Sequence, residues 1–258
     1  MRSILWIIGV PVAIFIAFFA FNSYIYNEKQ GDMSAQETSV EVIPISHATA
    51  VLQWDDTVFY TDPTGGAQAF AGQPAADIIL VTDIHGDHLS TSTLSAVVGP
   101  ETILVVPQAV KDELPADLAA RAKVLANGET LAEREFKILA MPMYNLPDVS
   151  NSNFHTKGRG NGYIIARDDT RVYIAGDTAG TPEMRALTGI DVALVPMNLP
   201  YTMGVEEAAD AVLAFKPRQV YPYHYRGPDG LADVAKFKQL VNAGDPNIEV
   251  ILADWYPH

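Results

Sequence analysis

The segment that most constrains the fold is the apolar run ADIILVT at residues 76–82, followed at once by the polar cluster DIHGDH at 83–88. A short, nearly continuous apolar run is typical of a strand buried on both faces, which needs packed layers above and below it. The cluster places two histidines and two aspartates within six positions. It indicates either a metal-binding loop at the end of a buried strand or an acid-rich turn.

The remaining sequence alternates strand-like and helix-like segments in two successive units. In the first unit we expect strands at 40–45, 48–54, 57–62, 102–107 and 136–145. We also expect two helices, one that begins near Ser90 and one that spans 114–125. The second unit should hold a hairpin over 162–178, strands at 191–198, 219–225 and 248–256, and helices at 182–189, 205–217 and 233–242. This repetition predicts an α/β fold with two stacked sheets flanked by helices.

The composition narrows the classes of function. The chain of 258 residues has a formal net charge of −14 and no block of basic residues, which argues against nucleic acid as a partner. A small-molecule or lipid-like substrate is the better expectation. Because the chain has no cysteine, any transition metal must be held by imidazole and carboxylate groups, which suits zinc, iron or manganese.

The first 27 residues (1–27) predict a single membrane-spanning anchor. No charged residue occurs from Ser3 to Asn27, and about 20 apolar residues suffice to cross a bilayer. A cleavable signal peptide is the alternative, but bulky Phe18 stands where a cleavage site prefers a small residue. The polar stretch 28–41 then predicts a flexible linker, and 42–258 one folded domain. The positive charge that precedes the span predicts that this domain lies on the exported side, periplasmic or extracellular.

Four of the six histidines, together with one aspartate, lie just beyond predicted strands. Because open α/β sheets bring the ends of their strands together, residues far apart in sequence can meet in one crevice. Side chains two apart in an extended segment face the same way, so the alternate residues of the 83–88 cluster can converge on one ion. Two ions about 3.5–4 Å apart need about seven ligands. The sequence offers that number: Asp83, His85, Asp87, His88, His155, Asp177 and His224.

The order and spacing of these residues resemble those of the metallo-β-lactamase fold hydrolases. The matching pieces are HGDH at 85–88, His155 before KGRGNGY, AGDT at 176–179 and His224, and the likeness extends over about 43–258. It is greatest to the branch that includes the ascorbate-6-phosphate lactonase-like and N-acyl-phosphatidylethanolamine phospholipase D-like enzymes. The resemblance implies a four-layer αββα sandwich with a binuclear metal site along one edge.

The resemblance also implies a ligand set. The first metal would take His85 and His155; the second would take Asp87, His88 and His224; Asp177 would bridge the two. The commonest family pattern has a histidine where this sequence has Asp83. We expect Asp83 still to bind the first metal through a carboxylate oxygen. This would make the site more anionic, weaken its metal as a Lewis acid and shift its preference toward manganese or iron.

The expected activity is hydrolysis with two divalent ions, zinc being the first choice. Two cations lower the pKa of a bound water, so that hydroxide could attack an ester, lactone, amide or phosphodiester bond, with Asp87 orienting it and receiving its proton. Two alternatives stay open: a di-iron redox protein of the same fold, and a non-catalytic interaction domain stabilised by metal. The second alternative needs a closed ligand shell, whereas loop ends predict an open one.

Four further features carry weaker expectations. His47 follows the first strand. A role at the rim of the site and a role in packing are equally favoured for it. Asp62, in YTDPTGG, fits a turn-forming Asp-Pro better than a role beside a metal. The glycines around Gly160 should let their loop pass close to the metals. The loop 198–203 is a candidate for the substrate side.

Overall fold

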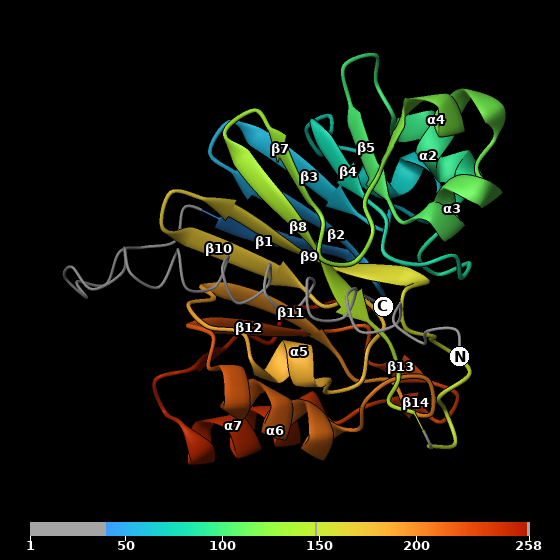
Figure 1. Cartoon of the computed structure of the whole chain (residues 1–258). Coiled ribbons are helices and arrows are strands. Elements are labelled where there is room, and N and C mark those ends of the chain that lie inside the picture. Colours follow the sequence, from blue (N-terminus) through green and yellow to red (C-terminus); the bar gives the residue numbers. More distant parts are fainter. Residues whose placement is uncertain (1–39, 148, 257–258) are drawn as a thin grey trace, which may run out of the picture.

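The computed structural model describes residues 40–147 and 149–256, where two β-sheets lie face to face with helices on their outer sides (Figure 1). The first sheet holds six strands, and the strands neighbour one another in sequence order. They are β1 (Val40–Ser46), β2 (Thr49–Trp54), β3 (Thr57–Thr61), β4 (Ile78–Leu80), β5 (Ile103–Val106) and β6 (Ala122–Val124). The first three are antiparallel, whereas β3 to β6 run parallel.

The second sheet holds seven strands and repeats this mixture of antiparallel and parallel pairs. In spatial order they are β15 (Glu249–Val250), β12 (Gln219–Tyr223), β11 (Val192–Pro196), β10 (Thr170–Ile174), β9 (Gly160–Arg167), β8 (Phe136–Met143) and β7 (Thr130–Glu133). Strands β10, β11, β12 and β15 run parallel to one another. A separate hairpin joins β13 (Arg226–Gly227) to β14 (Gly230–Leu231).

Helices cover each sheet on its outer side, as Figure 1 shows. Those on the first sheet are α2 (Thr91–Val97), α3 (Gln108–Glu113) and α4 (Ala116–Arg121), with the 3-10 turn η1 (Ala67–Phe70) nearby. Those on the second are α5 (Pro182–Arg185), α6 (Val205–Phe215) and α7 (Val234–Gly244). The predicted four-layer αββα sandwich is confirmed.

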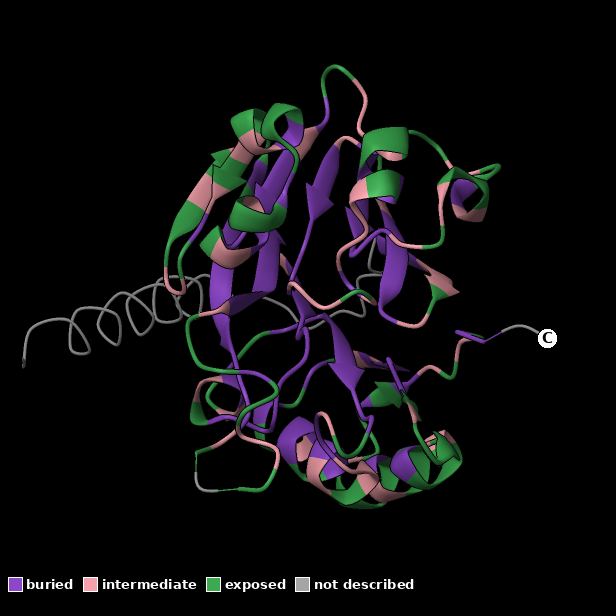
Figure 2. Cartoon of the chain, turned by 90° about the vertical axis from the view of Figure 1, so that its right-hand side faces the viewer, coloured by how far each residue is buried: buried purple, intermediate pink, exposed green. Residues whose placement is uncertain are grey.

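Strand β4 shows why the run 76–82 is apolar almost throughout. Ile78 and Leu80 pack in the core between the two sheets, whereas Ile79 and Val81 pack in a second core beneath α2, α3 and α4. All four side chains are fully buried. Because successive side chains of a strand point to opposite faces, a strand covered on both sides needs apolar residues at consecutive positions. Figure 2 shows this arrangement, with buried strands inside and exposed residues on the outer helix surfaces.

The helix predicted over 114–125 is wrong at its end. Helix α4 stops at Arg121, and the next three residues form β6, which pairs with β5. The sequence AARAKVL has helical propensity, but pairing at the open edge of the sheet outweighs that weak preference. The last predicted strand, 248–256, is also too long, because only Glu249 and Val250 pair with β12. Trp255, which follows the paired residues, is nevertheless completely buried.

The predicted membrane anchor, 1–27, lies outside the described residues, as does the predicted linker up to residue 39. Strand β1 begins at Val40, so the last two residues assigned to the linker belong to the sheet. Within the described residues, none of the helices combines the length and the apolar character that a bilayer crossing requires.

Candidate metal centre

The predicted ligands meet at one edge of the sandwich, where strands of both sheets end. The loop after β4 supplies the 83–88 cluster, the turn after β10 supplies Asp177, and the residue after β12 is His224. His155 comes from the long loop between β8 and β9. All seven predicted side chains fall into groups that could hold an ion. Crossing between parallel strands therefore gathers distant residues, as the sequence predicted.

The first group consists of Asp83, His85 and His155. Oδ2 of Asp83 lies 2.9 Å from Nδ1 of His85 and 3.8 Å from Nε2 of His155. Asp83 and His155 are buried, whereas the His85 side chain is 38% exposed. The three side chains lie close enough together that they could hold one ion.

The second group consists of His88, Asp177 and His224, with Asp87 beside it. Nε2 of His88 lies 3.1 Å from Nε2 of His224 and 3.3 Å from Oδ2 of Asp177. Nε2 of His224 lies 3.4 Å from Oδ1 of Asp177 and 3.3 Å from Oδ2 of Asp87. Asp177 Oδ2 is also 3.2 Å from His155 Nε2. One carboxylate thus faces both groups, which is the position expected for a bridging ligand.

The donor set fits divalent metal ions. Ligand atoms 2.0–2.2 Å from a tetrahedral ion stand roughly 3.3–3.6 Å apart, close to the separations within both groups. Two donor atoms, Nε2 of His155 and Oδ1 of Asp177, are buried without a hydrogen-bond partner. Buried polar atoms are rarely left without a hydrogen bond, so these two could serve as ligands to an ion.

The side of the centre facing solvent is open. The side chains of Asp87 and His85 are 42% and 38% exposed, whereas those of His88 and His224 are fully buried. Structural metal sites are usually closed by protein ligands, and catalytic sites keep an accessible position. The arrangement corresponds to the open type.

Asp62 fixes His88, which corrects the expectation that it only forms a turn. It is fully buried after β3 with a φ of 45°, and its Oδ2 lies 2.8 Å from Nδ1 of His88. Thr82 donates its backbone N–H to Oδ1 and its hydroxyl to Oδ2. A carboxylate on Nδ1 sets the imidazole tautomer and leaves Nε2 for a metal. The available signal was position: Asp62 ends a strand, as Asp83 does.

The Nδ1 atoms of the other two buried imidazoles, those of His155 and His224, also contact protein groups. Nδ1 of His155 lies 3.2 Å from the carbonyl oxygen of Tyr201, and Nδ1 of His224 lies 2.8 Å from the side-chain amide of Asn198. Both partners belong to the predicted substrate-side loop 198–203. This loop therefore orients two ligands, a role that the sequence analysis did not predict.

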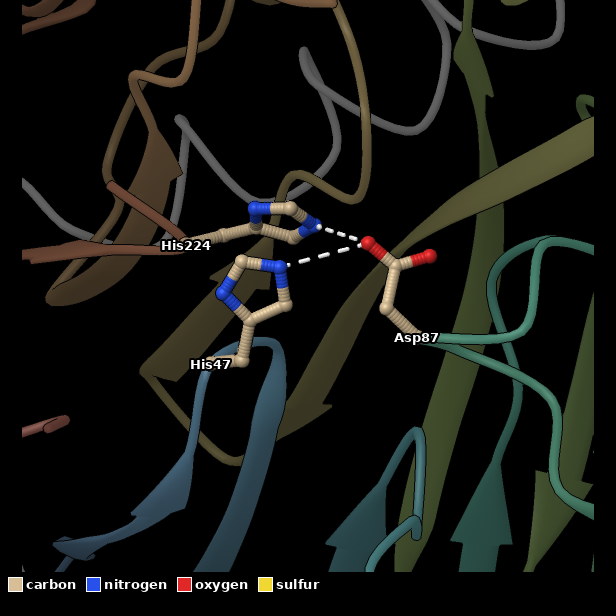
Figure 3. A group of neighbouring side chains, drawn as sticks. All are labelled: His47, Asp87 and His224. Atoms are coloured by element: carbon tan, nitrogen blue, oxygen red, sulfur yellow. Dashed lines mark hydrogen bonds and ion pairs between the residues drawn. The ribbon is translucent and has the colours of Figure 1, made fainter. Parts of the chain in front are cut away.

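His47 belongs to the site rather than to packing alone. It lies in the turn between β1 and β2, and its Nε2 is 3.2 Å from Oδ2 of Asp87 (Figure 3). The ring centres of His47 and His224 are 3.9 Å apart. On its other side, Nδ1 meets the hydroxyl of Tyr256 at 2.6 Å. The imidazole thus connects the end of the chain to Asp87.

The sequence analysis missed Arg159. Its guanidinium donates two hydrogen bonds to Asp83, from Nε to Oδ1 at 3.0 Å and from Nη2 to Oδ2 at 2.8 Å. The available signal was a cation in the loop KGRG, four residues after His155. Nearby, Gly160 allows close approach, since a Cβ there would lie 2.8 Å from the carbonyl oxygen of Thr82.

Burial and charge oppose one another at the ionisable groups. Burial would lower the pKa of His88, but the carboxylates of Asp177 and Asp62 raise it well above its ordinary value. Burial would raise the pKa of Asp177, but His224 and His88 hold it well below its usual range. For Asp87, burial is outweighed by hydrogen bonds with His224 and His47, which lower its pKa. Without metal, His88 keeps a proton that an arriving cation must displace.

Comparison with known proteins also indicates a metal-dependent enzyme. The family model described as the beta-lactamase superfamily domain matches residues 41–224. The metal-dependent hydrolase UPF0173 of Pyrococcus horikoshii is 34% identical over 224 residues, which is 83% of this chain and 96% of that protein. A crystal structure of a candidate metal-dependent hydrolase from Parabacteroides distasonis matches with a TM-score of 0.73 and 36% identity, covering 83% of this chain and 92% of that one.

The fold is shared more widely. Igni18, a metallo hydrolase from Ignicoccus hospitalis, has a TM-score of 0.69 at 22% identity, covering 83% of this chain and 95% of that one. Fold and site together define a hydrolase of the metallo-β-lactamase type. The chain belongs to the β-lactamase superfamily, and it is a metal-dependent hydrolase. The branch expected from the sequence stays a prediction.

We predict that Asp62→Asn weakens metal binding about 10–100-fold, the usual effect of losing a partner behind a ligand. An amide cannot hold the His88 Nδ1 proton as a carboxylate does. Chelator competition on the purified protein measures the change. Asp191→Asn is the matched control, because Asp191 is also buried and accepts the backbone N–H of Arg171 at 2.8 Å. Equal losses in the two variants would contradict the role assigned to Asp62.

The metal-free protein should lose stability as pH rises. The folded-state pKa of His88 is raised above 6.5, so its contribution is full below about pH 6.5 and disappears as pH rises through the raised pKa. The lowered pKa of Asp177 changes stability only in acid, so the contribution of Asp177 is constant over this pH range. Thermal unfolding from pH 6 to 9 in chelator should show a fall that His88→Gln flattens. A slope unchanged by the substitution would refute this prediction.

Proposed function

We propose that the protein is a binuclear hydrolase that cleaves an ester, lactone, amide or phosphodiester bond of a small-molecule or lipid-like substrate. Zinc is the first choice of metal, with manganese or iron as alternatives. The observation that carries the proposal is the meeting of four chain segments around two ligand groups that share Asp177. The lack of a hydrogen bond at Nε2 of His155 and at Oδ1 of Asp177, both buried, supports a bound cation.

Each ligand has a place in this centre. The first ion would be held by Asp83, His85 and His155; the second by Asp87, His88 and His224; both by Asp177. When bound, two divalent ions supply Lewis acidity and make a water molecule acidic near neutral pH. The protein contributes the rigid geometry, because carboxylate, amide and carbonyl groups hold the imidazoles from behind.

Asp87 is the residue proposed to orient the water that attacks the substrate. Its side chain is the most exposed of the ligand carboxylates, so it alone reaches both the centre and the solvent side. Its lowered pKa keeps it ionised at neutral pH, when it can accept a hydrogen bond from the attacking water and orient it. His47 fixes the carboxylate from the opposite side at 3.2 Å.

The open ligand shell favours catalysis over a purely structural metal. A metal that only stabilised the fold would be expected behind closed protein ligands. Here His85 and Asp87 face solvent, and the remaining ligands are buried beneath them. This supports turnover over the non-catalytic alternative.

The rim of the centre supports a substrate with an apolar part. Phe154 is 39% exposed next to His155, and its ring meets that of Tyr201 at 5.1 Å. Leu199, in the loop that orients two ligands, is 58% exposed. Beside this rim a cavity of about 480 Å³ is lined by Tyr144, Asn145, Pro147, Ser152, Asn153, Thr156 and Lys157. Exposed apolar side chains grouped around a site commonly mark ligand binding.

We predict that His85→Ala and Asp177→Ala each lower turnover by more than about a hundredfold, beyond the loss expected for a residue behind a ligand. Both should remain folded by circular dichroism. The full chain is first analysed for bound metal, then tested on a panel of esters, lactones, amides and phosphodiesters. Asp210→Ala is the control, because that carboxylate is 72% exposed on α6.

The outcomes separate the competing functions. Two ions with hydrolysis that both variants abolish support the proposal. Redox-active iron without hydrolysis would favour the di-iron alternative, and bound metal without any turnover would favour the interaction domain. Near-normal activity of either variant would show that its residue is not a ligand.

We further propose that residues 1–27 anchor the enzyme in a membrane, with the domain on the exported side. The support is the absence of charge from Ser3 to Asn27. The full chain should sediment with membranes and resist extraction by carbonate, whereas a chain that begins at Val40 should stay in the supernatant. A mature protein whose N-terminus begins after residue 27 would show instead that the segment is a cleaved signal.

A further inference from the structure

Arg159 holds Asp83 in a two-pronged ion pair. Nε donates to Oδ1 at 3.0 Å and Nη2 donates to Oδ2 at 2.8 Å, so both carboxylate oxygens are engaged by one planar group. Paired N–H donors of a guanidinium match the two oxygens of a carboxylate, which adds directional precision to charge attraction. Asp83 is fully buried, and the arginine side chain is 20% exposed.

The same guanidinium also contacts the rest of the first ligand group. Nη2 donates to the carbonyl oxygen of Phe154 at 2.7 Å and lies 3.4 Å from Nε2 of His85. Phe154 directly precedes His155. Arg159 therefore connects the loop after β4, which carries Asp83 and His85, with the loop that carries His155.

Asp83 differs from the other carboxylates of the centre. Among the described residues, Asp87 and Asp177 form ion pairs with histidines only, whereas Asp83 also pairs with an arginine. An imidazole ligand is neutral, and a carboxylate adds one negative charge. A guanidinium on that carboxylate cancels the added charge.

We propose that Asp83 and Arg159 act as one unit that takes the place of a neutral ligand at the first metal position. Arg159 is a positioning residue in this unit: it turns Oδ2 toward His85 and His155 and offsets the charge of Asp83. The inference rests on the two-ion centre proposed above. If the two residues form one unit, either change alone harms the first position, and changing both together harms it less.

The test is a double-mutant cycle read by metal binding rather than by activity. Asp83→His leaves the guanidinium without its carboxylate beside a cation, and Arg159→Gln leaves the buried carboxylate without its positioning group. Each should weaken binding of one of the two ions about tenfold or more. The double variant should return to within about threefold of the unsubstituted protein. Chelator competition with zinc measures both steps, and His85→Ala, which alters only the first group, identifies the step concerned.

The result that overturns the inference is additivity. If Arg159→Gln weakens binding equally with and without Asp83→His, the arginine only braces the His155 loop. If Arg159→Gln tightens binding, its charge repels the ion and does not position Asp83. If the unsubstituted chain binds a single ion, the two-ion centre is wrong and the inference falls with it. Two bound ions with additive effects would refute the Arg159 inference alone.

Thermal unfolding gives a second measurement should Asp83→His fail to fold. In Arg159→Gln the metal-free protein should lose about 4 °C or more in Tm, because the buried carboxylate has no cation, and the metal-loaded protein should lose clearly less. Equal losses with and without metal would contradict the inference. Arg167→Gln is the matched control: it lies at the opposite end of β9 and pairs with Asp55 and Glu135, so metal should not change its effect.

Discussion

The structure depends on holding several ionisable side chains together, most of them buried. Taking a carboxylate or a charged imidazole out of water costs on the order of several kcal/mol unless a partner compensates it. Here Asp177 is surrounded by three imidazoles, Asp83 has Arg159, and His88 has Asp62. Even so, Oδ1 of Asp177 and Nε2 of His155 are buried without a hydrogen bond. These donors could hold metal.

That constraint explains why so many groups stand behind the ligands. An imidazole can offer Nε2 to a metal only if Nδ1 carries its proton toward an acceptor. Asp62 and the carbonyl of Tyr201 provide this acceptor for His88 and His155, whereas Nδ1 of His224 accepts from the amide nitrogen of Asn198 at 2.8 Å. All three lie at or just beyond strand ends, where the rigid sheets limit their movement. On the same loops, Phe154 and Leu199 face solvent.

Local patterns predicted the fold well where burial is complete and poorly where it is not. The apolar run before the 83–88 cluster predicts β4 correctly, since two covered faces leave no other residue type stable there. The short edge strand β6 was predicted as helix, because its residues favour a helix locally and only β5 makes them extended. Similarly, the local sequence around Asp62 indicates a turn residue, whereas its contact with His88 joins two residues that are 26 positions apart in the chain.

The sequence by itself determined the chemistry that is available: four imidazoles and three carboxylates at strand ends, no thiolate, and a layered α/β core to carry them. Tertiary structure alone decided which groups face each other. It placed Asp177 between the two ligand groups, brought His47 to Asp87, and set Arg159 on Asp83. The reason is physical, since residue types and their periodicity follow from short-range rules, whereas pairing across loops depends on where two separately formed sheets meet.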